Sequence, residues 1–201
     1  MIKYKPAIVV VSAASGTGKT TVINRILEIE HGLFYSVSAT TRPKRPNEKN
    51  GKDYIFIKRD TFQKWIKENK LLEWAEVYGE YYGTPKEPIE KALSLGQSVI
   101  ADLDVNGMKE IKKHYSEDAV SVFLFPPDFD TLIERLKNRG TETESQLKIR
   151  IERLKHELAN APLYDYWVLN DSVEHAARRI LSILHSMESL SSRLSPFKIP
   201  L

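Results

Sequence analysis

Residues 13–20 are the part of this 201-residue sequence whose types and spacing point most directly to chemistry. They read Ala-Ala-Ser-Gly-Thr-Gly-Lys-Thr and follow the apolar run 8–11. The next segment has the apolar spacing of a helix, at Val22, Ile23, Ile26 and Leu27. A glycine-rich turn between a strand and a helix aims backbone N–H groups at a phosphate, where the helix dipole also favours negative charge. In this pattern Lys19 would contact the β- and γ-phosphates of a nucleotide, and the Thr20 hydroxyl would bind Mg²⁺.

The motif departs from the usual Gly-x-x-x-x-Gly-Lys-Ser/Thr at its first position, which is Ala13. Alanine is compatible with that position if its φ is negative, as the end of a strand provides. The rival interpretation is an ordinary strand-turn-helix connection, which the flanking strand and helix make less attractive. The predicted phosphate-binding loop (P-loop) and helix start comprise Ala13, Ala14, Ser15, Gly16, Thr17, Gly18, Lys19, Thr20 and Thr21.

Composition excludes several other kinds of site. The chain has no cysteine, and its five histidines show no metal-ligand spacing, so any metal is expected to be Mg²⁺ held mainly by phosphates. A net charge of +3, with both signs interleaved, gives no support for nucleic-acid binding. The apolar stretch 7–14 is too short to span a membrane and the N-terminus lacks signal-peptide features, so we expect a cytoplasmic protein.

The elements that must position the loop follow from three further apolar runs, at 98–103, 119–125 and 166–169. Each resembles a buried parallel strand. Helical stripes lie between or after them, over 129–136, 147–158 and 173–184. This alternation predicts an α/β fold, a doubly wound parallel sheet with helices on both faces and with ligands at the carboxyl ends of the strands.

Residues 35–97 have a different pattern, which predicts a small mixed α+β insertion. Short strands at 53–57 and 72–77 flank a helix that we expect to begin at Asp60, with Gln63 as its capping partner. Arg42 and Arg45 lie in a proline-stiffened loop of this segment and could grip a phosphate bidentately.

The same insertion offers further groups for a nucleotide. The hydroxyl groups of Tyr54, Tyr82 and Thr84 could donate hydrogen bonds to a phosphate. Glu73 could read guanine, whose adjacent N–H donors suit one carboxylate. Taken singly, these residues fit a solvated basic loop, a hairpin at 78–83 and a surface carboxylate better than a nucleotide site.

Taken in order along the chain, the motifs strongly resemble those of guanylate kinase. They are Ser-x-x-Ser-Gly-x-Gly-Lys (12–19), Ser-Val-Ser-x-Thr-Thr-Arg-Pro-x-Arg (36–45), Asn-Gly-Lys-Asp-Tyr-x-Phe (50–56), Glu-Trp-Ala-Glu (73–76), Tyr-Tyr-Gly-Thr (81–84), Asp-x-Asp-x-x-Gly (102–107), Arg-x-x-x-Arg-Gly-Thr (135–141) and Asn-Asp (170–171). The resemblance extends from Ile8 to about Met187. It implies Mg²⁺-dependent transfer of a phosphoryl group from ATP to GMP, with dGMP as a second acceptor, for GMP recycling and GTP supply.

The resemblance also implies a division of residues 1–187 into three parts. The core would comprise about 1–34, 98–128 and 162–187, the GMP-binding insertion about 35–97, and a helical lid about 129–161. We expect the lid hinge at 140–145, which contains the only glycine between the two lid helices. The tail, 188–201, lies beyond the resemblance, and its role is not predicted.

Individual roles follow from the matched motifs. The resemblance assigns the GMP phosphate to Arg42, Arg45, Tyr54 and Tyr82, and the guanine to Ser38, Glu73, Thr84 and Asp104. It places Asp102 at Mg²⁺, through water, together with Thr20, and it places Asn170 and Arg139 near the adenine. The implied catalytic set is Lys19, Arg42, Arg135, Arg139 and Arg150. The simpler alternatives are a helix cap for Asp104 and surface cations for the last three arginines.

Two other functions were weighed against a kinase of this type. A non-catalytic module that binds a phosphorylated peptide in the GMP site could retain Arg42 and Arg45, but it would have no use for Lys19, Thr20 and Asp102. A P-loop enzyme acting on a sugar phosphate would have no use for a guanine reader such as Glu73. The expected partners are therefore ATP and GMP, with no nucleic acid and no membrane, and the sequence does not decide between a monomer and a homo-oligomer.

Overall fold

The structure is a computed structural model that describes residues 4–14, 16–128, 152 and 154–190. Ser15, the predicted hinge 140–145 and the lid arginines Arg135, Arg139 and Arg150 lie outside the described residues, as does the tail from 191 onward.

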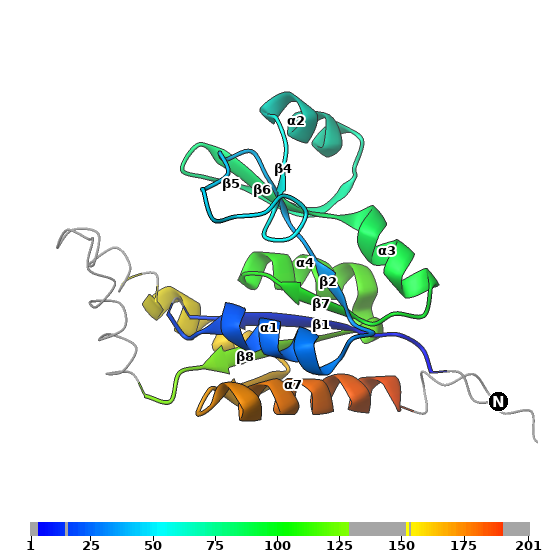
Figure 1. Cartoon of the computed structure of the whole chain (residues 1–201), viewed down its shortest axis with the longest axis vertical. Helices are drawn as coiled ribbons and strands as arrows, with labels where there is room; N and C mark the ends of the chain where they lie inside the picture. Colours follow the sequence, from blue (N-terminus) through cyan, green and yellow to red (C-terminus); the bar gives the residue numbers. More distant parts are fainter. Residues whose placement is uncertain (1–3, 15, 129–151, 153, 191–201) are drawn as a thin grey trace, which may run out of the picture.

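A five-stranded parallel sheet forms the centre of the fold (Figure 1). Its strands, in spatial order, are β2 (Phe34–Ser36), β7 (Val99–Asp102), β1 (Ile8–Ala13), β8 (Ala119–Phe125) and β9 (Tyr166–Leu169). All four pairings are parallel. From β1 the chain first builds one side of the sheet and then the other, so the carboxyl end of β1 lies at the topological switch point, where such sheets bind ligands.

Helices cover both faces of this sheet, because successive residues of β1 are buried in two different cores. Ile8 and Val10 face a core shared with α3 (Lys86–Ser94) and α4 (Val105–Tyr115). Val9 and Val11 face the other core, shared with α1 (Lys19–Ile29) and α7 (Val173–Glu188). Figure 1 shows α4 and α7 on opposite sides of the sheet. The predicted doubly wound α/β fold is confirmed.

A second, four-stranded sheet lies beyond the central one, at the top of Figure 1. Its order is β4 (Ile55–Phe56), β3 (Ala39–Thr40), β6 (Glu80–Pro85) and β5 (Leu71–Val77), with parallel and antiparallel pairs. Helix α2 (Arg59–Lys67) buries Phe62 against Ala39 and Leu71 in a small core of its own. This is the mixed α+β insertion that the sequence predicted.

Two parts of the predicted insertion, 35–97, lie instead with the central sheet. Strand β2 pairs with β7, and α3 buries Ile89 and Ala92 in the central core. At the other boundary, Leu154 and Ala161, predicted in the lid, are also buried in that core. Short apolar segments carry too little periodicity to show which of two cores they join.

The predicted start of α2 was wrong. The helix begins at Arg59 with Lys58 as its N-cap and has no side-chain capping bond. Asp60 lies inside the first turn, where its negative charge interacts favourably with the helix dipole but does not cap the helix. Short 3₁₀ segments occur at η1 (Ser116–Asp118) and η2 (Ala161–Leu163). None of the helices in the described ranges combines the length and the apolar character needed to cross a bilayer.

Candidate functional site

The phosphate-binding loop joins β1 to α1 at the carboxyl edge of the central sheet. Strand β1 ends at Ala13, which does not have a positive φ, so alanine is compatible with this position as expected. Gly16 and Gly18 have φ of 90° and 92°, in the left-handed region that favours glycine. Helix α1 begins at Lys19 with Gly18 as its N-cap, so its first backbone N–H groups have no partner within the helix and point into the loop.

Lys19 reaches across this edge to Asp102, the last residue of the neighbouring strand β7. The two side chains form an ion pair and are 23% and 24% exposed. The register of β1 against β7 sets Asp102 opposite Val11, just before the loop. A lysine and a carboxylate predicted at the ATP phosphates and at Mg²⁺ are therefore direct neighbours.

The donor set around the loop fits Mg²⁺. Asp102 and Thr20 offer oxygen atoms, which a hard divalent cation prefers, and Thr20 is exposed at the start of α1. Among the described residues no group of three or more His, Cys, Asp or Glu could hold a metal by itself. A cation here would therefore need phosphate and water as its other ligands, as the sequence led us to expect.

Asn170 braces the loop from the end of β9. Its side-chain amide donates a 2.7 Å hydrogen bond to the Thr17 carbonyl, and the residue is only 8% exposed. A Cβ atom added to Gly18 would lie 3.2 Å from the same amide nitrogen. The structure thus places Asn170 against the phosphate loop, with its amide donor already engaged there.

A pocket of about 270 Å³ opens between the two sheets. Its walls include Asp102 and most of the residues predicted to bind GMP, namely Ser38, Tyr54, Glu73, Tyr82 and Asp104. The first four come from the insertion and its loops, whereas Asp102 and Asp104 come from the end of β7 and the residues after it. The residues predicted to bind GMP and the phosphate-binding loop therefore meet at Asp102, which both lines this pocket and pairs with Lys19.

Glu73 is a partly buried carboxylate in the pocket wall. Thr84, which is fully buried on the adjacent strand, donates a 2.6 Å hydrogen bond to its Oε1. Burial raises the pKa of Glu73 above its ordinary value, the negative charges of Asp104 and Glu110 add to this effect, and the Thr84 hydrogen bond opposes it. A desolvated carboxylate of this kind is suited to accept adjacent N–H donors.

Asp104 is the N-cap of α4, as the alternative interpretation predicted. Its Oδ1 accepts hydrogen bonds from the backbone N–H groups of Asn106 and Gly107, at 3.0 and 2.9 Å. Because both capping bonds use Oδ1, Oδ2 is left for a ligand in the pocket. Capping and ligand binding are therefore compatible roles for this residue.

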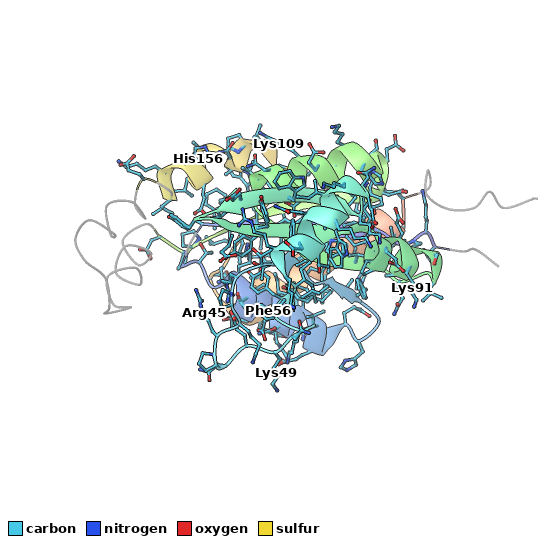
Figure 2. The ribbon with its side chains drawn as sticks, turned by 90° about the horizontal axis from the view of Figure 1, so that it is seen from above. Arg45, Lys49, Phe56, Lys91, Lys109 and His156 are labelled. Atoms are coloured by element: carbon cyan, nitrogen blue, oxygen red, sulfur yellow. The ribbon has the colours of Figure 1, made fainter. Side chains whose placement is uncertain are left out.

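The two insertion arginines differ in their surroundings. Arg42 is 13% exposed, forms an ion pair with Glu48, and lies with its guanidinium 5.2 Å from the centre of the Tyr54 ring. Arg45 is exposed, and Figure 2 shows it on the same side of the molecule as Lys49 and Phe56, away from Lys109 and His156. Glu48 was not predicted as a site residue, although a carboxylate in a loop with two arginines indicates an ion pair with one of them.

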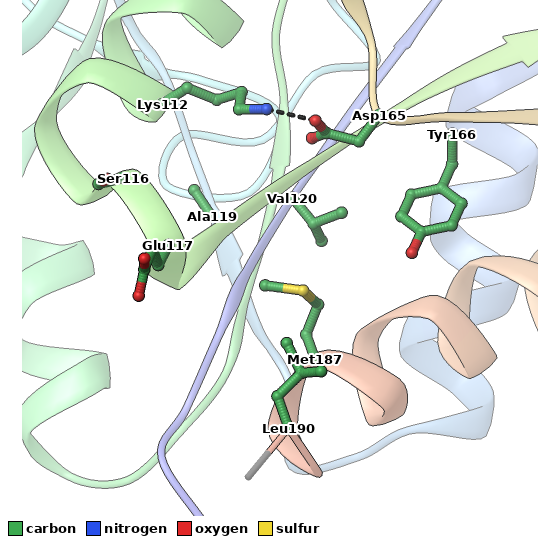
Figure 3. A pocket seen from close by; sticks show the side chains of 9 residues that line it. All are labelled: Lys112, Ser116, Glu117, Ala119, Val120, Asp165, Tyr166, Met187 and Leu190. Atoms are coloured by element: carbon green, nitrogen blue, oxygen red, sulfur yellow. Dashed lines mark hydrogen bonds and ion pairs between the residues drawn. The ribbon is translucent and has the colours of Figure 1, made fainter. Parts of the chain in front are cut away.

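A larger pocket, of about 620 Å³, lies at the other end of the sheet (Figure 3). It is lined by the first residues of β8 and β9 and by the ends of α4 and α7, and its polar side chains include the ion pair of Lys112 with Asp165. It contains none of the predicted site residues. Volume alone therefore does not identify the site, because in sheets of this type ligands bind at the carboxyl ends of the strands.

Comparisons with known proteins agree on one family. The family model described as guanylate kinase matches residues 5–187. A guanylate kinase of Carboxydothermus hydrogenoformans is 46% identical over 90% of this chain and 88% of its own length. One of Onion yellows phytoplasma is 42% identical over 96% and 91%. The crystal structure of guanylate kinase from Anaplasma phagocytophilum superposes with a TM-score of 0.79 at 31% identity, covering 96% of this chain and 92% of that one. Guanylate kinases transfer a phosphoryl group from ATP to GMP, and these matches show that this chain belongs to the guanylate kinase family.

Proposed function

We propose that this chain binds the ATP phosphates at loop 13–21 and GMP in the 270 Å³ pocket, and transfers the γ-phosphoryl group between them. The observation that carries this arrangement is the position of Asp102, which lines the acceptor pocket and pairs with Lys19 of the loop. A donor and an acceptor bound on either side of one carboxylate can be brought into line for transfer.

Recognition of GMP is divided between its base and its phosphate. Glu73 accepts from guanine N1–H and from the exocyclic amine, and Ser38, Thr84 and Asp104 complete the base site. Arg42, Arg45, Tyr54 and Tyr82 hold the phosphate. The support is the convergence of all of these residues except Arg45, which is exposed. Glu73 and Thr84 are hydrogen-bonded, while the rings of Tyr54 and Tyr82 lie 6.0 Å apart in an edge-on contact beside Arg42. We expect dGMP to be a second acceptor.

The chemistry needs positioning and positive charge rather than a protein nucleophile. Phosphoryl transfer passes through a loose transition state, so the GMP phosphate oxygen attacks in line while cations neutralise the equatorial oxygens. Lys19 supplies one such charge, and we assign the others to Arg42 and to Arg135, Arg139 and Arg150, the last three of which lie outside the described residues. Mg²⁺ supplies charge neutralisation when bound, and Thr20 and, through water, Asp102 are the residues that would hold it.

We also propose the division into core, insertion and lid, with the insertion narrowed to about 37–85 because β2 and α3 pack with the central sheet. The lid, predicted at about 129–161, is narrowed to the part before Leu154, because Leu154 and Ala161 pack in the central core. It would close over the donor to exclude water, and Arg139 and Asn170 would lie on the adenine side. We place the protein in the cytoplasm, without a nucleic-acid partner, in keeping with its net charge of +3.

Lys19→Ala tests whether the two subsites are separate. Turnover should fall by about 10²-fold or more, the cost of removing one charge from the transferring group, while calorimetry still detects GMP binding. Lys112→Ala is the matched control, because Lys112 is also a partly exposed lysine paired with an aspartate, at the far end of the sheet. A loss of GMP affinity as large as the loss of turnover would mean that the subsites are assigned wrongly.

A further inference from the structure

The loop that carries Arg42 and Arg45 also carries a carboxylate that contacts both. Glu48 Oε1 accepts from Nη2 of Arg42 at 2.6 Å, and Oε2 accepts from Nη1 of Arg42 at 2.8 Å. Oε2 also accepts the backbone N–H of Arg45, at 2.8 Å. The side chains of Arg42 and Glu48 are 13% and 16% exposed, so this bidentate pair is largely shielded from water.

The bonds to Glu48 use one edge of the guanidinium and leave another. Both N–H groups of Nη1 are engaged, because Nη1 also donates to the Pro43 carbonyl at 2.9 Å. One N–H group of Nη2 is engaged with Glu48. The parallel Nε–H and second Nη2–H are not used by Glu48 or Pro43, and such a parallel pair is the fork with which arginine binds a phosphate. The Tyr82 hydroxyl also lies within hydrogen-bonding reach of this guanidinium, so both groups can meet the same phosphate.

Two neighbouring aromatic rings also pack beside the guanidinium. The Tyr54 and Phe56 rings lie 5.2 and 5.5 Å from the Arg42 Cζ atom. Hydrogen bonding to Glu48 raises the pKa of Arg42, to which Tyr82 also contributes, and the same pair lowers the pKa of Glu48 to about 2. Both groups are therefore charged at neutral pH.

We propose that Glu48 is a positioning residue for GMP binding, which fixes the Arg42 guanidinium so that its Nε–Nη2 edge is presented to the GMP phosphate. The inference rests on the proposed role of Arg42 at that phosphate. A long arginine side chain loses rotamer freedom when it grips a ligand, and ordering it beforehand removes that cost from the binding step. The backbone N–H of Arg45 donates to the same carboxylate, which holds Glu48 in place beside Arg42.

The opposite role for Glu48 would be that of a competitor. A carboxylate that occupied the phosphate site would have to leave Arg42 when GMP binds, and removing it would then strengthen binding. The Arg45 N–H bond and the bond from the Glu48 N–H to the Arg45 carbonyl, at 3.1 Å, fix Glu48 within the loop itself. The two roles therefore predict effects of opposite sign.

Glu48→Gln tests the proposal, with dissociation constants for GMP and for guanosine measured by calorimetry. Glutamine keeps the shape but cannot accept the second arginine bond, so GMP affinity should fall roughly 5- to 10-fold, the factor expected when one long side chain must be ordered on binding. Guanosine, which has no phosphate, should bind equally well to both proteins. Glu68→Gln is the matched control, since it removes a carboxylate paired with Lys70 on the same insertion and should leave both constants unchanged.

Arg42→Ala separates this inference from the proposed function. In that background Glu48→Gln should have no further effect on GMP affinity, because Glu48 acts through Arg42. If Arg42→Ala itself leaves GMP affinity unchanged, the assignment of Arg42 fails and the inference with it. If Arg42→Ala weakens binding but Glu48→Gln leaves it unchanged, strengthens it, or weakens guanosine equally, the inference alone is overturned. Glu48→Asp, which keeps the charge on a shorter side chain, should give a smaller loss in the same direction.

Discussion

At the residue scale, Glu73 has an environment that costs the fold stability and gives the pocket its chemistry. Burial raises the pKa of this carboxylate, and Thr84 supplies its one hydrogen bond from a side chain among the described residues. A partly satisfied buried charge is costly to the folded state. This loss of stability is offset in the complex if a ligand supplies the missing hydrogen-bond donors, as the base of GMP would.

Glu73→Gln should therefore weaken the discrimination between guanine and adenine. The value of kcat/KM for GMP is expected to fall by about 10²-fold or more, because a charge-assisted pair contributes up to ~3 kcal/mol. Activity with AMP should fall far less, since adenine has no hydrogen at N1 and no amine at C2. Steady-state kinetics with both acceptors checks this, with Glu76→Gln on the exposed side of the same strand as the control. Unchanged discrimination would remove Glu73 from the base site.

The same substitution should stabilise the free protein at neutral pH. Because the pKa of Glu73 is raised on folding, the folded state holds its proton more tightly than the unfolded state. The stability of the natural protein is therefore reduced as pH rises from the ordinary glutamate range through the raised value. Thermal unfolding should show a higher Tm for Glu73→Gln at pH 7, with a difference that shrinks below about pH 4. A lower Tm at pH 7 would contradict the raised pKa.

At the element scale, the β5–β6 hairpin holds the base site together. It carries Glu73 on one strand and Tyr82 and Thr84 on the other, and Gly83 lies opposite Trp74 in its register. A Cβ added to Gly83 would lie 2.8 Å from the Glu73 carbonyl oxygen and 3.0 Å from the Phe62 ring. Only glycine lets the two strands and α2 approach this closely.

Gly83→Ala should accordingly separate the hairpin strands and displace Glu73. We expect a loss of about 1–3 kcal/mol of stability, the usual cost of overpacking, with a higher KM for GMP and little change in KM for ATP. Gly32→Ala is the control, because a Cβ there meets only a glutamate side chain at 3.7 Å. Chemical denaturation and steady-state kinetics measure both effects, and an unaltered KM for GMP would show that the hairpin does not set the base site.

The elements also show what a sequence can and cannot predict. Strand β8 coincides with the apolar run 119–125, because a strand buried on both faces reads as a continuous apolar segment. Strand β9 coincides with the run 166–169, but it is an edge strand on which only Val168 is buried, so the expectation of a buried strand was wrong there. Strand β3 has only two residues and carries no such pattern, whereas β4, also of two residues, lies within the strand predicted at 53–57. The hydrogen bond between Asn170 and Thr17 joins residues 153 positions apart, so no local sequence pattern could predict it. The Arg42–Glu48 pair was within reach of sequence reasoning, but its bidentate geometry was not.

At the scale of the whole molecule, two separately packed sheets meet around Asp102. The central sheet supplies the phosphate loop and the ends of β1 and β7, and the insertion supplies the walls that face them. Each sheet has its own core, so the acceptor pocket lies between two units rather than inside one. Binding sites at such junctions can close when both ligands are present, which would protect the phosphoryl group from water.

The most direct test of this account is the rate of ADP release from MgATP by the natural chain, measured with GMP, dGMP, AMP, CMP or UMP as acceptor. A guanine site built on Glu73 predicts rapid release with GMP, slower or comparable release with dGMP, and a kcat/KM for AMP lower by about 10⁴-fold or more. The pyrimidine nucleotides should be equally poor. Release that is as fast with AMP, CMP or UMP as with GMP, or that occurs with none of them, would contradict the account.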